Sequence, residues 1–312
     1  MTARPDRQAW LEECPPHLRP ALQACASGAL PANIALLRLL IETVDRNEVE
    51  TTIEAAVEGA CRQPRARRAA ARLQQVLTLW RENPQAFATV KAVLQGVEHG
   101  GTAAAVEEGI ADWARTFDRM AQASPEGSVA LYALGNPGLL RAATDEVVAR
   151  MREWRLLGRD RAVLEIGCGI GRFAAALAPE CESILGLDIS EALIAQARQR
   201  CAGLPNVTLV RSSGRDLAAA ADATIDLVLA ADVFPYLVQT GVELVDRHFD
   251  EAARVLKPAG HLLILNFSYR GDLRQDRSDI AGLAARRGFE LRRSASQDFT
   301  LWDAATFLLR RR

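Results

Sequence analysis

The stretch RAVLEIGCGIGRF, residues 161–173, is the most informative pattern for the fold of this chain. It reads as a short buried strand at 162–166, followed by a loop with Gly167, Gly169 and Gly171, and then by an apolar helix. The first glycine lets the chain turn sharply off the strand, the second leaves bare backbone for a ligand, and the third lets the helix pack closely. The stretch therefore predicts a strand, loop and helix unit with a nucleotide-sized pocket.

Two acidic residues accompany the loop. Glu165 lies two residues before the first glycine, and Asp188 ends a second apolar strand at 183–187. A carboxylate at the end of the neighbouring strand can accept hydrogen bonds from ribose hydroxyls. A glycine loop alone is weakly specific, because dinucleotide-binding domains use a similar one. Their pattern is GxGxxG, however, and the pattern here is GxGxG.

Strands and helices alternate through the C-terminal half of the chain, which indicates a parallel sheet covered on both faces. The expected strands are 162–166, 183–187, 206–210, 225–230, 260–266, 289–294 and 305–310. The expected helices are 171–178, 191–202, 241–256 and 280–287. The predicted fold class is α/β, with a doubly wound, mostly parallel, seven-stranded sheet and an all-α domain before it.

The ordered segments VLEIGCGIGRF, ILGLDIS, IDLVLAADVFPYL and EAARVLKPAGHLLILNFS resemble the class I S-adenosylmethionine-dependent methyltransferases. The resemblance covers residues 150–312, about half of the chain, and it implies a Rossmann-like sheet ending in an antiparallel hairpin. It also implies S-adenosylmethionine as the cofactor. The family's loop under the methionine part corresponds to Gly167, Cys168, Gly169 and Gly171.

The same resemblance assigns further cofactor contacts. Asp188 would bind the ribose, Ile189 would lie against the adenine, and Glu165 occupies the family's acidic position before the glycines. Ser213, Gly214, Arg215 and Asp216 stand where the family usually has Gly-Asp, and the extra Arg215 leaves open which of them meets the adenine. An alternative for Asp216 is that it caps the next turn. Tyr132 is either a contact to the methionine end or a structural residue.

Residues after the fourth and fifth strands are the candidates for chemistry, because ligands of open α/β sheets bind beyond the carboxyl ends of the strands. Asp232 is expected to orient or deprotonate the acceptor, with Tyr236 as the second candidate. Asn266, Tyr269 and Arg270 are expected to bind substrate together with Tyr236. Arg270 has an alternative role, tying its loop to Asp272 or Asp276. Of the histidines, His261 reads as structural and His248 as a surface residue.

The first hundred residues contain no convincing strand and predict a bundle of four or five helices. We expect domains at 1–101, 102–155 and 156–312: the bundle, a connecting and cofactor-covering segment, and the cofactor-binding domain. The expected helix at 33–44 carries apolar residues on more than one face, and 102–120 has a stripe typical of core packing. The bundle would cover the catalytic domain or form a homodimer.

Composition narrows the function. The net charge is −1, and neither an 18-residue apolar run nor a secretory signal is found, which indicates a cytoplasmic protein with a small-molecule substrate. The six dispersed cysteines indicate free thiols, and no metal site is expected. A basic cluster reads as a solvated helix start or a phosphate contact: Arg62, Arg65, Arg67, Arg68 and Arg72. The sequence thus predicts a methyltransferase of a small molecule with an O, N or C nucleophile.

Three alternatives stay open. The first is an NAD-dependent oxidoreductase, which would require the third glycine of the loop one residue later and a catalytic group for redox chemistry. The second is a protein that binds S-adenosylmethionine without turnover. The third is a methyltransferase of nucleic acid or protein, which the basic cluster would serve.

Overall fold

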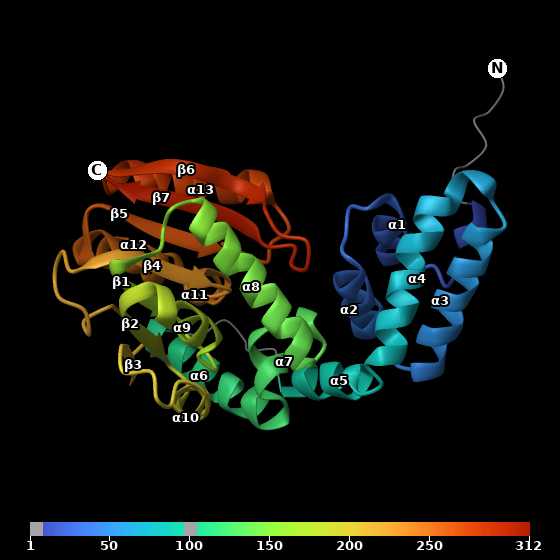
Figure 1. Ribbon diagram of the computed structural model, residues 1–312, viewed down its shortest axis with the longest axis horizontal. Helices are drawn as coiled ribbons and strands as arrows, with labels where there is room; N and C mark the ends of the chain where they lie inside the picture. The colour runs from blue at the N-terminus through green and yellow to red at the C-terminus, as the bar shows by residue number, and fades with distance from the viewer. Residues whose placement is uncertain (1–8, 97–104) are drawn as a thin grey trace, which may run out of the picture.

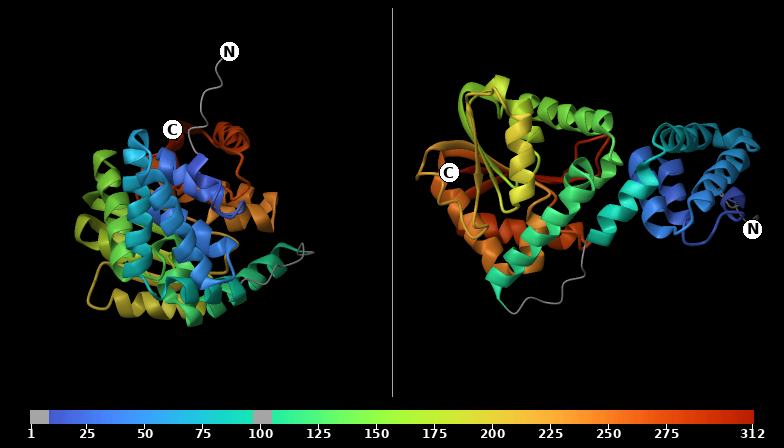
Figure 2. Two further views of the ribbon diagram at one scale, coloured as in Figure 1. Left: turned by 90° about the vertical axis from the view of Figure 1, so that its right-hand side faces the viewer. Right: turned by 90° about the horizontal axis from the view of Figure 1, so that it is seen from below.

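The computed structural model describes residues 9–96 and 105–312. It consists of a helical N-terminal region and a sheet domain, which lie side by side and are joined through α5 to α8 (Figures 1 and 2). The helical region contains α1 (Arg19–Ser27), α2 (Ala32–Glu42), α3 (Arg46–Cys61), α4 (Arg67–Glu82) and α5 (Ala86–Gly96), with short 3₁₀ turns at Ala9–Leu11 and Pro64–Ala66.

Local signals explain where these helices begin and end. Asp45 caps α3 by accepting a hydrogen bond from the Asn47 amide, and Gly28 closes α1 in the left-handed conformation. The helices bury a core of their own that includes Leu36, Ile53 and Trp80. The predicted all-α character of this region is confirmed, while the predicted boundary at 101/102 lies outside the described residues.

Three helices connect the two regions: α6 (Val106–Ala123), α7 (Pro125–Val129) and α8 (Pro137–Glu153), with a 3₁₀ turn at Leu131–Ala133 before α8. A buried amide fixes the helical region against the sheet domain. Asn33 Nδ2 donates to the carbonyl oxygens of Tyr132, at 3.0 Å, and Leu301, at 2.8 Å. Because leaving this amide unpaired would be costly, α2 has a defined position relative to the sheet.

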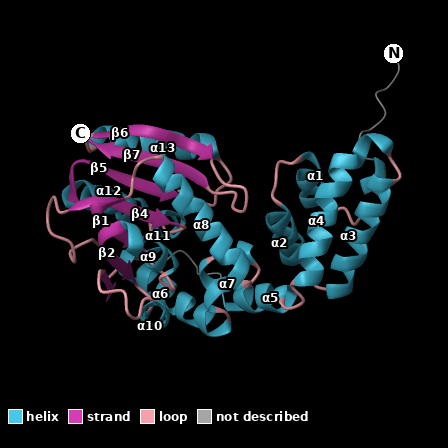
Figure 3. Cartoon of the chain, viewed as in Figure 1, coloured by secondary structure: helices cyan, strands magenta, loops and turns pink. Residues whose placement is uncertain are grey.

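The sheet has seven strands in the order β3-β2-β1-β4-β5-β7-β6 (Figure 3). They are β1 (Gly158–Ile166), β2 (Cys181–Asp188), β3 (Val207–Arg211), β4 (Ile225–Ala231), β5 (Leu256–Leu265), β6 (Phe289–Gln297) and β7 (Ala305–Arg311). Strands β1 to β5 are parallel, and β7 pairs antiparallel with both β5 and β6. The predicted fold class, including the closing hairpin, is confirmed.

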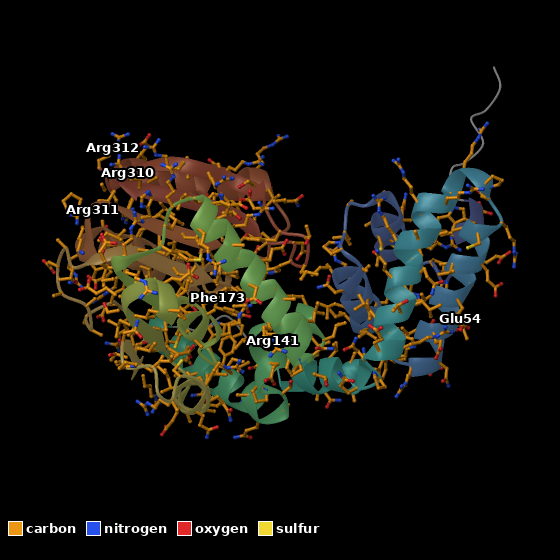
Figure 4. The ribbon with its side chains drawn as sticks, in the orientation of Figure 1. Glu54, Arg141, Phe173, Arg310, Arg311 and Arg312 are labelled. Carbon is orange, nitrogen blue, oxygen red and sulfur yellow. The ribbon has the colours of Figure 1, made fainter. Side chains whose placement is uncertain are left out.

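Helices cover both faces of the sheet. They are α9 (Arg172–Leu177), α10 (Glu191–Arg200), α11 (Phe234–Thr240), α12 (Val242–Val255) and α13 (Leu273–Arg286), together with α8. Helices α8 and α9 pack on one face. Phe173 of α9, labelled in Figure 4, is buried in the core on this face. The other face packs α12 and α13 around Phe249 and Phe307. Two cores on either side of one sheet account for a doubly wound domain.

One predicted location is wrong. His248 is only 2% exposed, and its Nδ1 lies 2.9 Å from the Leu244 carbonyl oxygen. It occupies the buried stripe of α12 one turn after Leu244, so burial lowers the pKa of its imidazole. His261 lies on β5, half-buried. No described helix is both long enough and apolar enough to cross a membrane.

Candidate functional site

The glycine loop joins β1 to α9 with three residues in the left-handed region, at φ of 66°, 52° and 73° for Gly167, Gly169 and Gly171. A Cβ on Gly167 would collide with Val233, and one on Gly169 would lie 2.6 Å from Val129 Cγ1. A side chain is therefore excluded at Gly167 and Gly169 both by the backbone conformation and by the surroundings. Bare backbone faces the space at the carboxyl end of β1.

Asp188 ties this loop to the next strand. Its Oδ2 accepts the Gly169 amide at 2.8 Å and its Oδ1 accepts the Ser190 amide at 2.9 Å, while the residue is only 7% exposed. Burial raises the pKa of Asp188 to about 6, and the bonds from backbone amides oppose that rise. The carboxylate thus holds the glycine loop and the start of α10 in one arrangement.

Helix α6 is fixed across the same edge of the sheet. Asp118 accepts hydrogen bonds from the Ser190 hydroxyl at 2.5 Å and from the Ala192 amide at 3.1 Å. Ser190 in turn caps α10 by accepting the Leu193 amide. A carboxylate at a helix N-terminus is favourable, so the contact joins α6 to α10.

A second buried carboxylate lies behind the loop. Glu165 is 2% exposed, and its Oε2 has no hydrogen-bond partner among the described residues. Burial raises its pKa to about 8, against the opposing effect of the Arg172 guanidinium. Arg172 is itself buried, donates to the Thr144 hydroxyl at 3.3 Å and lies 4.1 Å from the Phe173 ring centroid. The wall behind the loop therefore holds polar groups that the protein satisfies only in part.

Asp232 lies just past β4 and is held by two donors. Asn266 Nδ2 donates to its Oδ1 at 2.7 Å, and the Tyr269 hydroxyl donates to the same oxygen at 2.9 Å. Its other oxygen, Oδ2, receives no hydrogen bond from the described residues. Asp232 and Asn266 both have positive φ, 57° and 64°, an uncommon conformation for residues other than glycine that concentrates at functional sites.

The pKa of Asp232 is raised to about 6. Burial is the largest cause, and the hydrogen bonds from Asn266 and Tyr269 oppose it. A carboxylate with this pKa is mostly ionised at pH 7 and is still a stronger proton acceptor than an ordinary aspartate. Its Oδ2, which accepts no hydrogen bond from the described residues, is the oxygen that can accept a proton.

Four aromatic rings stand beside Asp232. Trp113 and Phe117 of α6 lie 4.7 and 5.0 Å from the Tyr236 ring, both edge to face, and the Tyr236 and Tyr269 rings are 6.0 Å apart. Burial raises the pKa of the Tyr236 phenol further above neutrality. Tyr236 is consequently a neutral phenol at neutral pH, and it packs among these rings.

A cavity of about 580 Å³ connects these features, a volume suited to a small ligand. Its walls include Gly167, Gly169, Asp188 and Asp232, and it continues between α6 and the helical region. The cavity fits an adenosyl group at one end, because the glycine backbone is bare there and Asp188 and Ile189 adjoin it. Among residues 9–96 and 105–312, no cluster of His, Cys, Asp and Glu could hold a metal ion.

A family model described as a methyltransferase domain matches residues 164–264, which contain the glycine loop, Asp188 and Asp232. Residues 164–264 of this chain are a methyltransferase domain, which lies within the seven-stranded sheet. The resemblance to the class I S-adenosylmethionine-dependent methyltransferases is confirmed, and so is S-adenosylmethionine as the cofactor of this domain.

Curated relatives share the methyltransferase domain. A demethylmenaquinone methyltransferase of Clavibacter sepedonicus is 31% identical over 49% of this chain and 56% of its own length. A probable S-adenosylmethionine-dependent methyltransferase of Mycolicibacterium smegmatis is 34% identical over 38% and 42%. The chain thus spans about half the length of the curated relatives it matches. A structure of Haemonchus contortus phosphoethanolamine N-methyltransferase 1 matches with a TM-score of 0.49 and 17% identity, over 69% of this chain and 50% of that one.

The methyltransferase domain brings most of the predicted site residues to the cavity. The predicted cofactor residues that line it are Tyr132, Gly167, Gly169, Asp188, Ile189, Gly214 and Asp216. The predicted catalytic and substrate residues that line it are Asp232, Tyr236, Asn266 and Tyr269. Asp216 also accepts the Ala218 amide and pairs with Arg247, so it caps the following turn as well.

Other predicted residues do not line the cavity of the methyltransferase domain. They are Glu165, Cys168, Gly171, Ser213, Arg215 and Arg270. Gly171 packs against Ala197, and the Cys168 side chain is buried against Gly186, so both shape the loop from behind.

The two arginines of this group are held by ion pairs. Arg215 pairs with Glu107 at 3.1 Å. The Arg270 guanidinium pairs with Asp276 at 2.5 Å and Asp279 at 2.7 Å, which supports its alternative role of tying down its loop, with Asp276 as one of the two partners named from the sequence.

Some cavity residues escaped the sequence analysis. Trp113 and Phe117 belong to the stripe on α6 that reads as core, and periodicity alone cannot distinguish a core from a ligand-facing wall. Trp302, in the β6–β7 loop, stacks on Tyr132 with ring centroids 5.1 Å apart. Arg172, which is buried behind the loop and does not line the cavity, also escaped it; its position directly after the third glycine is the one signal for it in the sequence.

Proposed function

We propose that this protein transfers a methyl group from S-adenosylmethionine to a small-molecule acceptor whose nucleophile carries a proton, such as a hydroxyl or an acidic C–H. The observation that carries the proposal is one cavity containing both the glycine loop with Asp188 and an Asp232 with a free carboxylate oxygen. The name of the Clavibacter relative supports a small-molecule acceptor.

Residues on the β1 and β2 side would hold the cofactor. Gly167 and Gly169 would offer backbone to its methionine part, Asp188 would accept from the ribose, and Ile189 and Gly214, which line the cavity, would border the adenine. When bound, S-adenosylmethionine supplies a methyl group on a positively charged sulfur that leaves as a neutral thioether.

Residues on the β4 and β5 side would prepare the acceptor. Asp232 Oδ2 accepts its proton, while Asn266 and Tyr269 hold Oδ1 and so fix the direction of Oδ2. Trp113, Phe117 and Tyr236 exclude water beside this carboxylate. Alignment of nucleophile and methyl carbon supplies up to roughly 7–11 kcal/mol of such a reaction, and a general base supplies about 10²–10⁴-fold.

The test is calorimetric titration of the protein with S-adenosylmethionine, S-adenosylhomocysteine and NAD in parallel, followed by transfer of radiolabelled methyl to a panel of phenols, enols and amines. We expect binding of the first two ligands and labelling of acceptors that have an ionisable hydroxyl. Binding of NAD alone would refute the proposal in favour of an oxidoreductase, and cofactor binding without any labelled product would favour a binding protein.

A further inference from the structure

The cavity extends beyond Asp232 into the helical region. Its far end is lined by apolar side chains from α2, α5 and α6, which we call the α2–α5 chamber: Ile34, Leu37, Ile41, Val93, Leu94 and Met120. The charged residues at this end, Arg38 and Asp303, pair with each other at 3.4 Å. The chamber therefore offers hydrocarbon surface and little else.

The chamber uses a second face of α2, at the edge of the helical core. Ile34 is buried in the core of the sheet domain and Leu37 packs partly against both cores, and both also line the cavity. Leu36, Leu39 and Leu40 of α2 are buried inside the helical region. Ile34, Leu37 and Ile41 recur three and four residues apart on another side of the same helix and line the cavity. An apolar second face next to a cavity is favourable only when something apolar covers it, because exposed hydrocarbon keeps its unfavourable hydration.

The chamber opens to solvent along α2. Ile41 lines the cavity and is 40% exposed, and Val44, just past the end of α2, is 90% exposed without lining the cavity. Arg38 and Asp303, at this end, are also partly exposed. A chain that entered from the Asp232 end could pass between α2 and α5 and reach the surface there.

We propose that the α2–α5 chamber receives an apolar chain carried by the methyl acceptor. The acceptor is then an amphiphile, with an ionisable head at Asp232 and a hydrocarbon tail between α2 and α5. The helical region thereby selects the substrate of the methyltransferase domain. This inference rests on the proposed function, which places the reacting head at Asp232.

The test uses 4-alkylphenols with chains from methyl to octyl, titrated into protein saturated with S-adenosylhomocysteine. Each methylene that enters the chamber should lower the dissociation constant about fourfold, equivalent to ~0.8 kcal/mol, until the chamber is full. The same dissociation constant for all chain lengths, or no binding by any of them, would overturn the proposal.

Two variants and a matched control locate the effect. Ile41→Asp should remove the gain for long chains and leave 4-methylphenol unchanged, and Leu37→Trp should shorten the chain length at which the gain stops. Val44→Asp places the same charge three residues further on, outside the cavity, and should behave as the wild type. Equal chain-length dependence in Ile41→Asp and the control would count against the chamber.

Methyl transfer to 4-methylphenol and binding of S-adenosylhomocysteine are measured separately. If the wild type transfers no methyl group to 4-methylphenol while its chain-length dependence persists, the proposed function is refuted and the chamber remains an apolar binding site. Normal methyl transfer with no chain-length dependence would support the proposed function and refute the chamber as the site of an apolar chain.

Discussion

Replacing Asp232 by Asn tests the proposed proton acceptor with little change in structure. An Asn keeps an oxygen to accept the bonds from Asn266 and Tyr269, and it tolerates the positive φ of this position better than most residues. It places an amide NH₂ where the free Oδ2 lies, so the side chain no longer accepts a proton. We expect kcat to fall by about 10²–10⁴-fold while S-adenosylhomocysteine binds as before.

The pH profile of the wild type gives a second, quantitative expectation. With the pKa of Asp232 at about 6, the carboxylate is about 97% ionised at pH 7.5 and about 9% ionised at pH 5. Because the base must be ionised to act, kcat/KM should fall about tenfold as the pH drops across that range. Initial rates of methyl transfer, measured at saturating S-adenosylmethionine in buffers of constant ionic strength, report this directly.

Tyr269→Phe serves as an internal check on the assignment. The Tyr269 hydrogen bond stabilises the ionised form of Asp232 and lowers its pKa, so its loss should move the inflection to higher pH. A hydrogen bond to a charged group is worth about 1.5–3 kcal/mol, which limits the shift to roughly one to two pH units. A flat wild-type profile between pH 5 and 7.5, or a fully active Asp232→Asn variant, would refute Asp232 as the base.

Three further substitutions test the cofactor side. Asp188→Ala removes the acceptor for two backbone amides and the ribose, so S-adenosylhomocysteine should bind more weakly by about 1–3 kcal/mol in calorimetry, and unchanged affinity would contradict this role. Gly169→Ala should abolish that binding, because its φ is +52° and its Cβ would meet Val129 at 2.6 Å, whereas Gly203→Ala, with nothing within 4 Å, should bind normally. Glu165→Gln should raise the melting temperature at pH 9 but not near pH 4. The pKa of Glu165 in the folded protein, about 8, exceeds its reference value of 4.5. The wild type therefore loses up to about 5 kcal/mol of its free energy of unfolding as the pH rises from 4.5 to 8, and the variant does not. Equal pH dependence in both proteins would show that Glu165 does not titrate in this way.

The sheet, the glycine loop and the positions of Asp188 and Asp232 at the ends of their strands could be predicted from the sequence alone. These features follow from short-range rules: apolar runs form buried strands, glycines allow positive φ, and parallel strands bring their carboxyl ends to one edge. The His248 prediction is wrong because His248 lies on the buried stripe of α12, one turn after Leu244, which is buried with it.

Which element or ligand covers each helix face could not be predicted from the sequence, because it depends on long-range packing. The stripe of Trp113 and Phe117 reads as core, yet α6 directs it at the cavity because Asp118 fixes that helix to the start of α10. The apolar second face of α2 has no assigned partner in the sequence, and it is the packing of Asn33 against Tyr132 and Leu301 that brings this face to the cavity. Periodicity specifies which side chains share a face, whereas long-range contacts specify whether protein, ligand or solvent meets it.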